Sequence, residues 1–149
     1  MSISKNVVDS TKAFIERNEN SFKSFPINIE EIVRNERINI VEPVFAPYLS
    51  GCFMFFRSEA LLALGGFDER FFMYMEDVDL SRRCASKFGN VYYPLAKVTH
   101  LHERASHKNI NLLKAHLKST FQYFNKWGWF YDSERNILNR NCLKQFSEY

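Results

Sequence analysis

The chain has 149 residues, of which 46% are apolar, and 20 Lys and Arg against 17 Asp and Glu give a formal net charge of +3. This length suits one domain, the apolar content excludes a disordered chain, and the weak charge excludes a dedicated nucleic-acid binder. Aromatic residues make up 16% of the chain, enough for a large core or for a core and an apolar contact surface.

The cysteines and the apolar runs point to a reducing compartment. Cys52, Cys84 and Cys142 are odd in number and far apart, so they predict neither a disulfide framework nor a metal-binding pair. The first twenty residues lack the apolar core of a signal peptide. The longest strictly apolar run, 52–56, is far too short for a membrane span.

In chain order, residues 1–47 form a polar N-terminal segment with a short predicted helix near 28–34. The run 51–56 predicts a buried strand, because both of its faces are apolar. A short helix over 59–64 follows, with Ser58 as its N-cap and two glycines at its end.

A second helix is predicted from Glu76, after an aromatic loop over 67–75. Its apolar stripe, repeated at i, i+4 and i+8, consists of Leu80, Cys84 and Phe88. The cations expected to lie largely away from this stripe are Arg82, Arg83 and Lys87. Carboxylates at the start of the helix and cations toward its end match the helix dipole.

A strand over 91–94 that resumes over 97–102 and an amphipathic helix over 109–127 complete the pattern, and the polar last twenty residues are expected to be peripheral. This order of elements predicts a mixed α/β fold. Three interpretations of the 109–127 helix stay open: core packing, a membrane-surface helix with flanking lysines, and a partner interface.

Three carboxylates, Glu76, Asp77 and Asp79, stand at the start of the second helix. Capping and dipole complementarity explain them without chemistry. A carboxylate fixed at a helix start beside apolar rings also suits a general base. A shared metal site for Asp77 and Asp79 is not expected, because positions i and i+2 of a helix point in different directions.

His100 and His102 would share one face of the last predicted strand. One imidazole with carboxylates and phosphate oxygens could hold a divalent cation there. The alternative is a pair of half-exposed histidines at a sheet edge. His107 and His116 have no partner at a useful spacing, so we take them as surface or helix residues.

Three strings in a fixed order carry a family resemblance: SGCFMFFRSEA at 50–60, GGFDERFF at 65–72 and EDVDLSRR at 76–83. With the continuation through 88–100, they resemble the second half of family 2 glycosyltransferases, in particular rhamnosyltransferase-like members. The resemblance covers about residues 48–128.

This resemblance implies a GT-A fold and inverting transfer of a sugar from a nucleotide donor. It assigns the catalytic base to Asp77. The acceptor-binding residues it implies are Glu76, Gly51, Asp68 and Arg83, with Asp68 as a loop anchor. His100, with His102 beside it, would help to hold Mg²⁺ or Mn²⁺ or the diphosphate.

We expect the nucleotide-binding N-terminal half of such a fold to be missing, because residues 1–47 are too short and too polar to supply it. We therefore expect a partial GT-A fold: an acceptor-side half over 48–130 and a peripheral tail over 131–149. The chain would act on a cell-surface polysaccharide or lipid-linked glycan precursor, in the cytoplasm or at the inner face of the membrane.

If the chain is only this half of the fold, we expect little transfer activity from it alone. We also expect it to self-associate or to pair with a separate chain that carries the donor-binding half. The alternative function is a non-catalytic fragment that acts as a binding or partner subunit.

Overall fold

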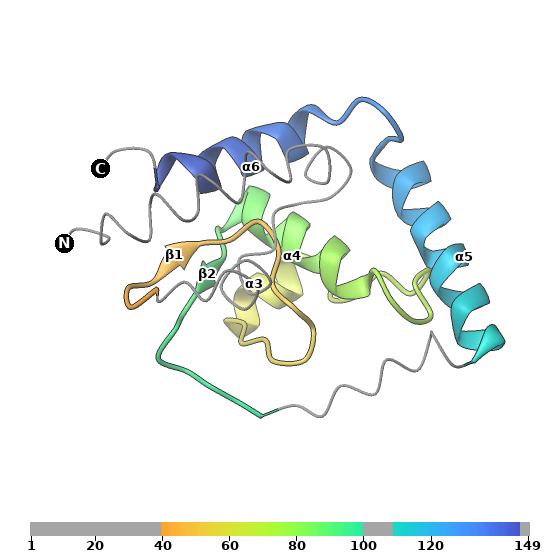
Figure 1. The fold of residues 1–149 in the computed structure, drawn as a ribbon, viewed down its shortest axis with the longest axis horizontal. Coiled ribbons are helices and arrows are strands. Elements are labelled where there is room, and N and C mark those ends of the chain that lie inside the picture. The colour runs from red at the N-terminus through yellow and green to blue at the C-terminus, as the bar shows by residue number, and fades with distance from the viewer. Residues whose placement is uncertain (1–39, 100–108, 147–149) are drawn as a thin grey trace.

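The structure is a computed structural model that describes residues 40–99 and 109–146 (Figure 1). Within these ranges the elements occur in the order β1 (Val44–Phe45), α3 (Ser58–Ala63), α4 (Glu76–Lys87), β2 (Val91–Tyr92), α5 (Ile110–Trp127) and α6 (Ser133–Lys144). The arrangement is mixed, and helices predominate over strands. No helix in these ranges is long and apolar enough to cross a membrane.

The central helix α4 begins at Glu76, as the sequence predicts, and ends at Lys87. It lies between the other elements in Figure 1, with α6 running alongside it. Leu80 and Cys84 of the predicted stripe are buried, whereas Phe88 is 49% exposed. The carboxylates of its first turn and Lys87 in its last turn match the helix dipole.

The strands β1 and β2 pair antiparallel, with Val44 opposite Tyr92. The chain turns at Pro94, and residues 97–99 are not in a strand, so the predicted continuation is wrong up to Thr99. The rest of that prediction, 100–102, lies outside the described residues.

The predicted buried strand over 51–56 is also wrong. Residues 51–53 form a turn and a bend, the backbone that follows is irregular, and Phe55 is 86% exposed. A short apolar run does not itself specify the strand with which it would pair. The helix after it is confirmed as α3, although Ser58 is its first helical residue and Arg57 takes the N-cap position.

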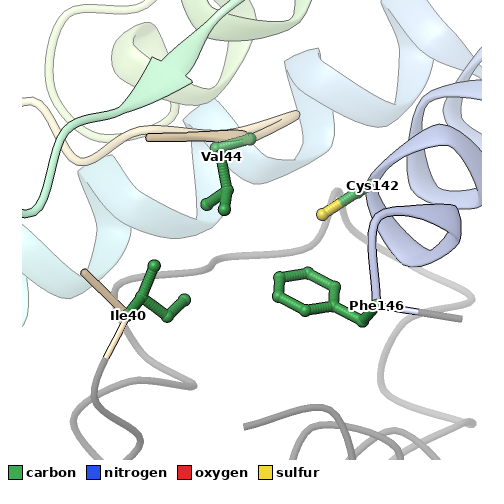
Figure 2. Packing of buried hydrophobic residues seen from close by; sticks show 5 residues of the cluster. Ile40, Val44, Cys142 and Phe146 are labelled. Carbon is green, nitrogen blue, oxygen red and sulfur yellow. The ribbon is translucent and has the colours of Figure 1, made fainter. Parts of the chain in front are cut away.

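A first apolar cluster joins β1 to the end of α6. It consists of Ile40, Val44, Ala46, Cys142 and Phe146, and four of these side chains converge in Figure 2. Gln145 pairs with β1 as a neighbouring strand would: its Oε1 accepts from the Phe45 N–H at 2.7 Å and its Nε2 donates to the Phe45 carbonyl at 3.0 Å. The last twenty residues are therefore not peripheral where they form α6.

A buried charge network fixes α4 against the start of α6. Arg82 is only 1% exposed, so the prediction that it lies off the buried face is wrong. Its guanidinium donates to both carboxylate oxygens of Asp132 at 2.5 Å and lies 3.9 Å above the ring of Trp127. Asp132 also caps α6 by accepting from the Arg135 N–H. Asp132, whose charge offsets the cost of burying Arg82, lies fifty residues away in the sequence.

Candidate functional site

An unusual turn precedes the acidic start of α4. Tyr74 and Met75 both have positive φ, at 66° and 68°, although neither is a glycine. Such residues cost about 1–3 kcal/mol each, so they persist only where the surroundings hold them in place. Helix α5 supplies that support: the Ser119 hydroxyl donates to the Met73 carbonyl at 2.7 Å, and the His116 ring stacks on Tyr74 at 4.6 Å.

Asp77 is half-buried and held in place by neutral donors. Its Oδ2 accepts from the Tyr48 hydroxyl at 3.0 Å and from the Gly51 N–H at 2.9 Å. Its Oδ1 accepts from the N–H of Val78 at 2.8 Å. Within 40–99 and 109–146, no ion pair neutralises it. A carboxylate has about four acceptor positions, so Oδ1 retains capacity for one more donor.

Gly51 lies against Asp77 so closely that a side chain would not fit. A Cβ added at Gly51 would stand 2.9 Å from the Asp77 Cβ and 3.2 Å from its Oδ2. The clashing Cβ is fixed by the helix backbone and cannot swing away. The glycine predicted as an acceptor-side residue therefore seats the carboxylate predicted as the base.

We expect Gly51→Ala to lower the free energy of unfolding by about 1–3 kcal/mol, as overpacked sites do. Thermal or urea denaturation measures this loss. The matched control repeats the substitution in an Asp77→Gly background, which removes the clashing Cβ. There Gly51→Ala should cost less than half as much. An equal cost in both backgrounds would show that the close approach does not matter.

Glu76, beside Asp77, has a carboxylate oxygen that the fold leaves unsatisfied. Its Oε2 is buried and has no hydrogen-bond partner in the described structure. Burial raises the pKa of this carboxyl, and the neighbouring charge of Asp77 raises it further. This oxygen is covered by the fold, so contact of Glu76 with an acceptor stays a prediction.

Replacing Glu76 by Gln should raise the melting temperature at neutral pH. The folded pKa lies above the unfolded one, so the wild type loses stability as pH rises through the folded pKa. The amide has no charge to bury, so its advantage should be present above that pKa and disappear in acid. Melting curves across pH test this, with the exposed Glu59→Gln as control. A pH-independent difference would contradict this account.

Asp79 has a structural role and points away from Asp77. It is fully buried, and its Oδ1 accepts from the Trp127 indole N–H at 2.8 Å and lies 2.6 Å from the Lys126 ammonium. Its Oδ2 accepts from Arg83 at 2.8 Å. Since cations already neutralise Asp79, this pair of aspartates does not fit a divalent metal. No group of three potential ligands gathers elsewhere in the described ranges.

Asp68 and Arg83 bind the chain itself. Hydrogen bonds from Arg70 hold the pKa of the Asp68 carboxyl well below its usual range, and Lys126 of α5 adds a contact at 2.7 Å. Arg83 donates to the carbonyls of Leu64 and Gly66 at 2.7 and 2.8 Å, which ties the end of α3 to α4. Asp68 thus links its loop to α5, and contact of either residue with an acceptor stays a prediction.

The predicted metal ligands His100 and His102 lie outside the described residues, as does His107. A surface hollow in the described part is lined by side chains of α4, α6 and β1, among them Ala85, Ser86 and Ile137. It lies near the end of α4, whereas the acidic cluster is at the start of that helix.

Sequence reasoning missed two groups of site residues. Tyr48 lies within the resembling stretch but has no local pattern that marks it as a partner of Asp77. The sequence places Trp127 and Lys126 on an amphipathic helix and gives neither a role, whereas both contact Asp79. The sequence around these two residues does not indicate an acidic partner, because that partner, Asp79, belongs to another helix.

Comparison with known proteins supplies the family context. Over 93 residues the chain is 44% identical to an N-acetylglucosaminyl-diphospho-decaprenol L-rhamnosyltransferase of Mycobacterium tuberculosis, a match that covers 59% of the chain and 29% of that protein. Homologues of this chain are bacterial rhamnosyltransferases. Rhamnosyltransferase WbbL of Escherichia coli K12 is 31% identical over 107 residues, covering 69% of the chain and 37% of that protein.

These matches confirm the resemblance to part of a rhamnosyltransferase. The rhamnosyltransferase-like chain matches well under half the length of either relative. No family model matches it, and no solved structure does.

Proposed function

We propose that this chain is the acceptor-binding and base-bearing portion of an inverting glycosyltransferase with a partial GT-A fold. Its donor would be a nucleotide-activated sugar, rhamnose by analogy with the relatives, and its acceptor a lipid-linked glycan precursor. The identity to rhamnosyltransferases supports the reaction class. The setting of Asp77 supports the role within it.

The single observation that carries the proposal is the way Asp77 is held. Two neutral donors, the Tyr48 hydroxyl and the Gly51 N–H, fix Oδ2, while Oδ1 keeps an open acceptor position. A purely capping aspartate would need only contacts with the N–H groups of its own helix. A general base needs a fixed, partly exposed and unneutralised carboxylate within reach of the proton it removes.

In the proposed reaction an acceptor hydroxyl donates its hydrogen bond to Asp77 Oδ1. As the hydroxyl oxygen forms its bond to the anomeric carbon, the proton moves to Asp77 and the bond from that carbon to the nucleotide diphosphate breaks. Attack opposite the leaving group inverts the anomeric configuration. Glu76, next to Asp77, would help to orient the same acceptor, as the resemblance implies.

The donor side of this reaction has to come from elsewhere. A donor-binding half in a separate chain would hold the nucleotide and stabilise the leaving diphosphate. The resemblance implies Mg²⁺ or Mn²⁺ in that role, with His100 or His102 as a ligand. The described carboxylates do not gather into a metal site, so the metal would be held together with the donor-binding half.

A reconstitution assay tests the proposal. The 149-residue chain is mixed with the separately produced donor-binding half of a homologous rhamnosyltransferase, nucleotide-activated rhamnose, a polyprenyl-diphosphate N-acetylglucosamine acceptor and Mg²⁺. Transfer of labelled rhamnose should need both proteins. The alternative function, a non-catalytic binding subunit, predicts that Asp77→Asn supports transfer as well as the wild type does.

A further inference from the structure

One face of α5 carries apolar side chains that the described chain leaves uncovered. The stripe consists of Ile110 (63% exposed), Leu113 (40%), Leu117 (61%) and Phe121 (57%). These residues recur at three- and four-residue steps, so they share one face. The opposite face contains the buried Ser119 and Tyr123 and packs on the rest of the molecule. Helix α5 lies at one edge of the fold in Figure 1.

The charge around this stripe has one sign. The segment from Ile110 to Tyr131 contains no Asp or Glu. Lys114 and Lys118 are exposed and lie one step around the helix from the stripe, on its border. Their long stems can lie along an apolar surface while the ammonium groups reach anions above it.

Exposed aromatic residues extend the stripe beyond the end of α5. Trp129 is held by stacking on Phe124 at 5.1 Å and by an indole N–H bond to Asn125 at 2.9 Å. Phe130 and Tyr131 follow, 87% and 95% exposed. Amphipathic rings such as Trp and Tyr favour the boundary between apolar chains and water.

We propose that this face of α5 is a membrane-contact surface that binds anionic lipid bilayers. An uncovered apolar stripe, a bordering row of lysines, no acids and terminal aromatics are together the chemistry of a helix lying in a bilayer interface. The surface is defined as Ile110, Leu113, Leu117, Phe121 and Trp129, with Lys114 and Lys118. It goes beyond the proposed function and does not depend on it.

The position of this surface also bears on the site. The opposite face of α5 supports the turn before the acidic residues, through Ser119 to Met73 and His116 to Tyr74. A helix is about 10 Å across, so a bilayer on the exposed face would lie one helix diameter from this turn. This step, which rests on the proposed function, fits an acceptor sugar carried on a membrane lipid.

Vesicle flotation with the full chain tests the membrane contact. Neutral phosphatidylcholine vesicles are compared with vesicles containing phosphatidylglycerol, at low and high salt. We expect binding to the anionic vesicles, lost at high salt. Lys114→Gln with Lys118→Gln should weaken binding by about thirtyfold. Leu117→Gln with Phe121→Gln should weaken it by about tenfold or more.

Matched controls change exposed residues elsewhere: Arg57→Gln with Lys97→Gln for charge, and Leu62→Gln with Leu95→Gln for apolar area. These should bind within about twofold of the wild type. Circular dichroism checks that every variant is folded.

Three results would overturn the membrane contact. The first is no binding to either kind of vesicle, and the second is an equal loss of binding in the variants and their controls. The third is that Leu117→Gln with Phe121→Gln dissociates a dimer of the chain and leaves vesicle binding unchanged. Asp77→Asn should float like the wild type. A failed reconstitution assay is therefore distinguishable from a failed membrane contact.

Discussion

Replacing Asp77 by Asn should reduce rhamnose transfer in the reconstituted assay by about 10²–10⁴-fold, the usual contribution of a general base. Asn fills nearly the same space, and its carbonyl oxygen can still accept from Tyr48 and Gly51. Its amide nitrogen takes the place of Oδ1, so the substitution removes the proton acceptor together with the hydrogen bond from the Val78 N–H. Initial rates of labelled sugar transfer measure the effect, with Glu59→Gln, on the exposed side of α3, as the charge-matched control.

A graded variant separates chemistry from positioning. Tyr48→Phe removes one of the two donors that hold Asp77 Oδ2 and leaves the base itself. One hydrogen bond contributes about 0.5–1.5 kcal/mol, so the transfer rate should fall only by about two- to tenfold. An Asp77→Asn loss no larger than the Tyr48→Phe loss would mean that Asp77 only shapes the site.

Asp132→Asn should cost about 3–5 kcal/mol in the free energy of unfolding, the usual penalty for breaking a buried ion pair. Arg82 and Asp132 have side chains that are 1% and 3% exposed, so water cannot replace the lost partner. Asn retains an oxygen that can cap α6. The loss of stability therefore measures mainly the removal of the Asp132 charge. Urea denaturation of the full chain measures it.

The neighbouring Glu134 is the matched control. It also contacts Arg82, at 3.1 Å, but its side chain is 42% exposed. Glu134→Gln should cost less than about 1 kcal/mol, as exposed ion pairs do. Similar losses for the two variants would show that the network is solvated and that Arg82 does not fix α4 to α6.

The helices α4 and α5 could be predicted from the sequence because each has a long apolar repeat and clear end signals. The start of α4 at Glu76 and the span of α5 agree with the structure to within a residue. The packing of Arg82 could not be predicted, because its partner Asp132 is remote in sequence.

Helix α6 and the 51–56 segment show the opposite errors. Helix α6 looks polar, yet Leu138 and Cys142 are enough to pack it on β1 and α4. The 51–56 run looks like a core strand, yet Phe53 and Phe55 are exposed, and their ring centroids lie 5.3 Å apart. Burial depends on which surfaces are available to cover a segment, and a local pattern does not contain that information.

The parts of the candidate site that depend on neighbouring residues in the sequence could be predicted. The contacts between segments that are distant in the sequence could not. The carboxylate at 77 stands out by its place at a helix start and by the family resemblance. The Tyr48 hydroxyl and the close approach of Gly51 come from a separate segment, and no spacing rule connects that segment to α4. The different roles of Asp77 and Asp79 follow from the helix geometry that argues against a shared metal.

Acceptor binding and sugar transfer, measured side by side for Asp77→Asn in the reconstituted assay, test the role of Asp77 most directly. If Asp77 takes the proton, the variant should bind the lipid-linked acceptor within about threefold of the wild type and transfer sugar at least about a hundredfold more slowly. Transfer at the wild-type rate, or a loss explained wholly by weaker acceptor binding, would contradict that role.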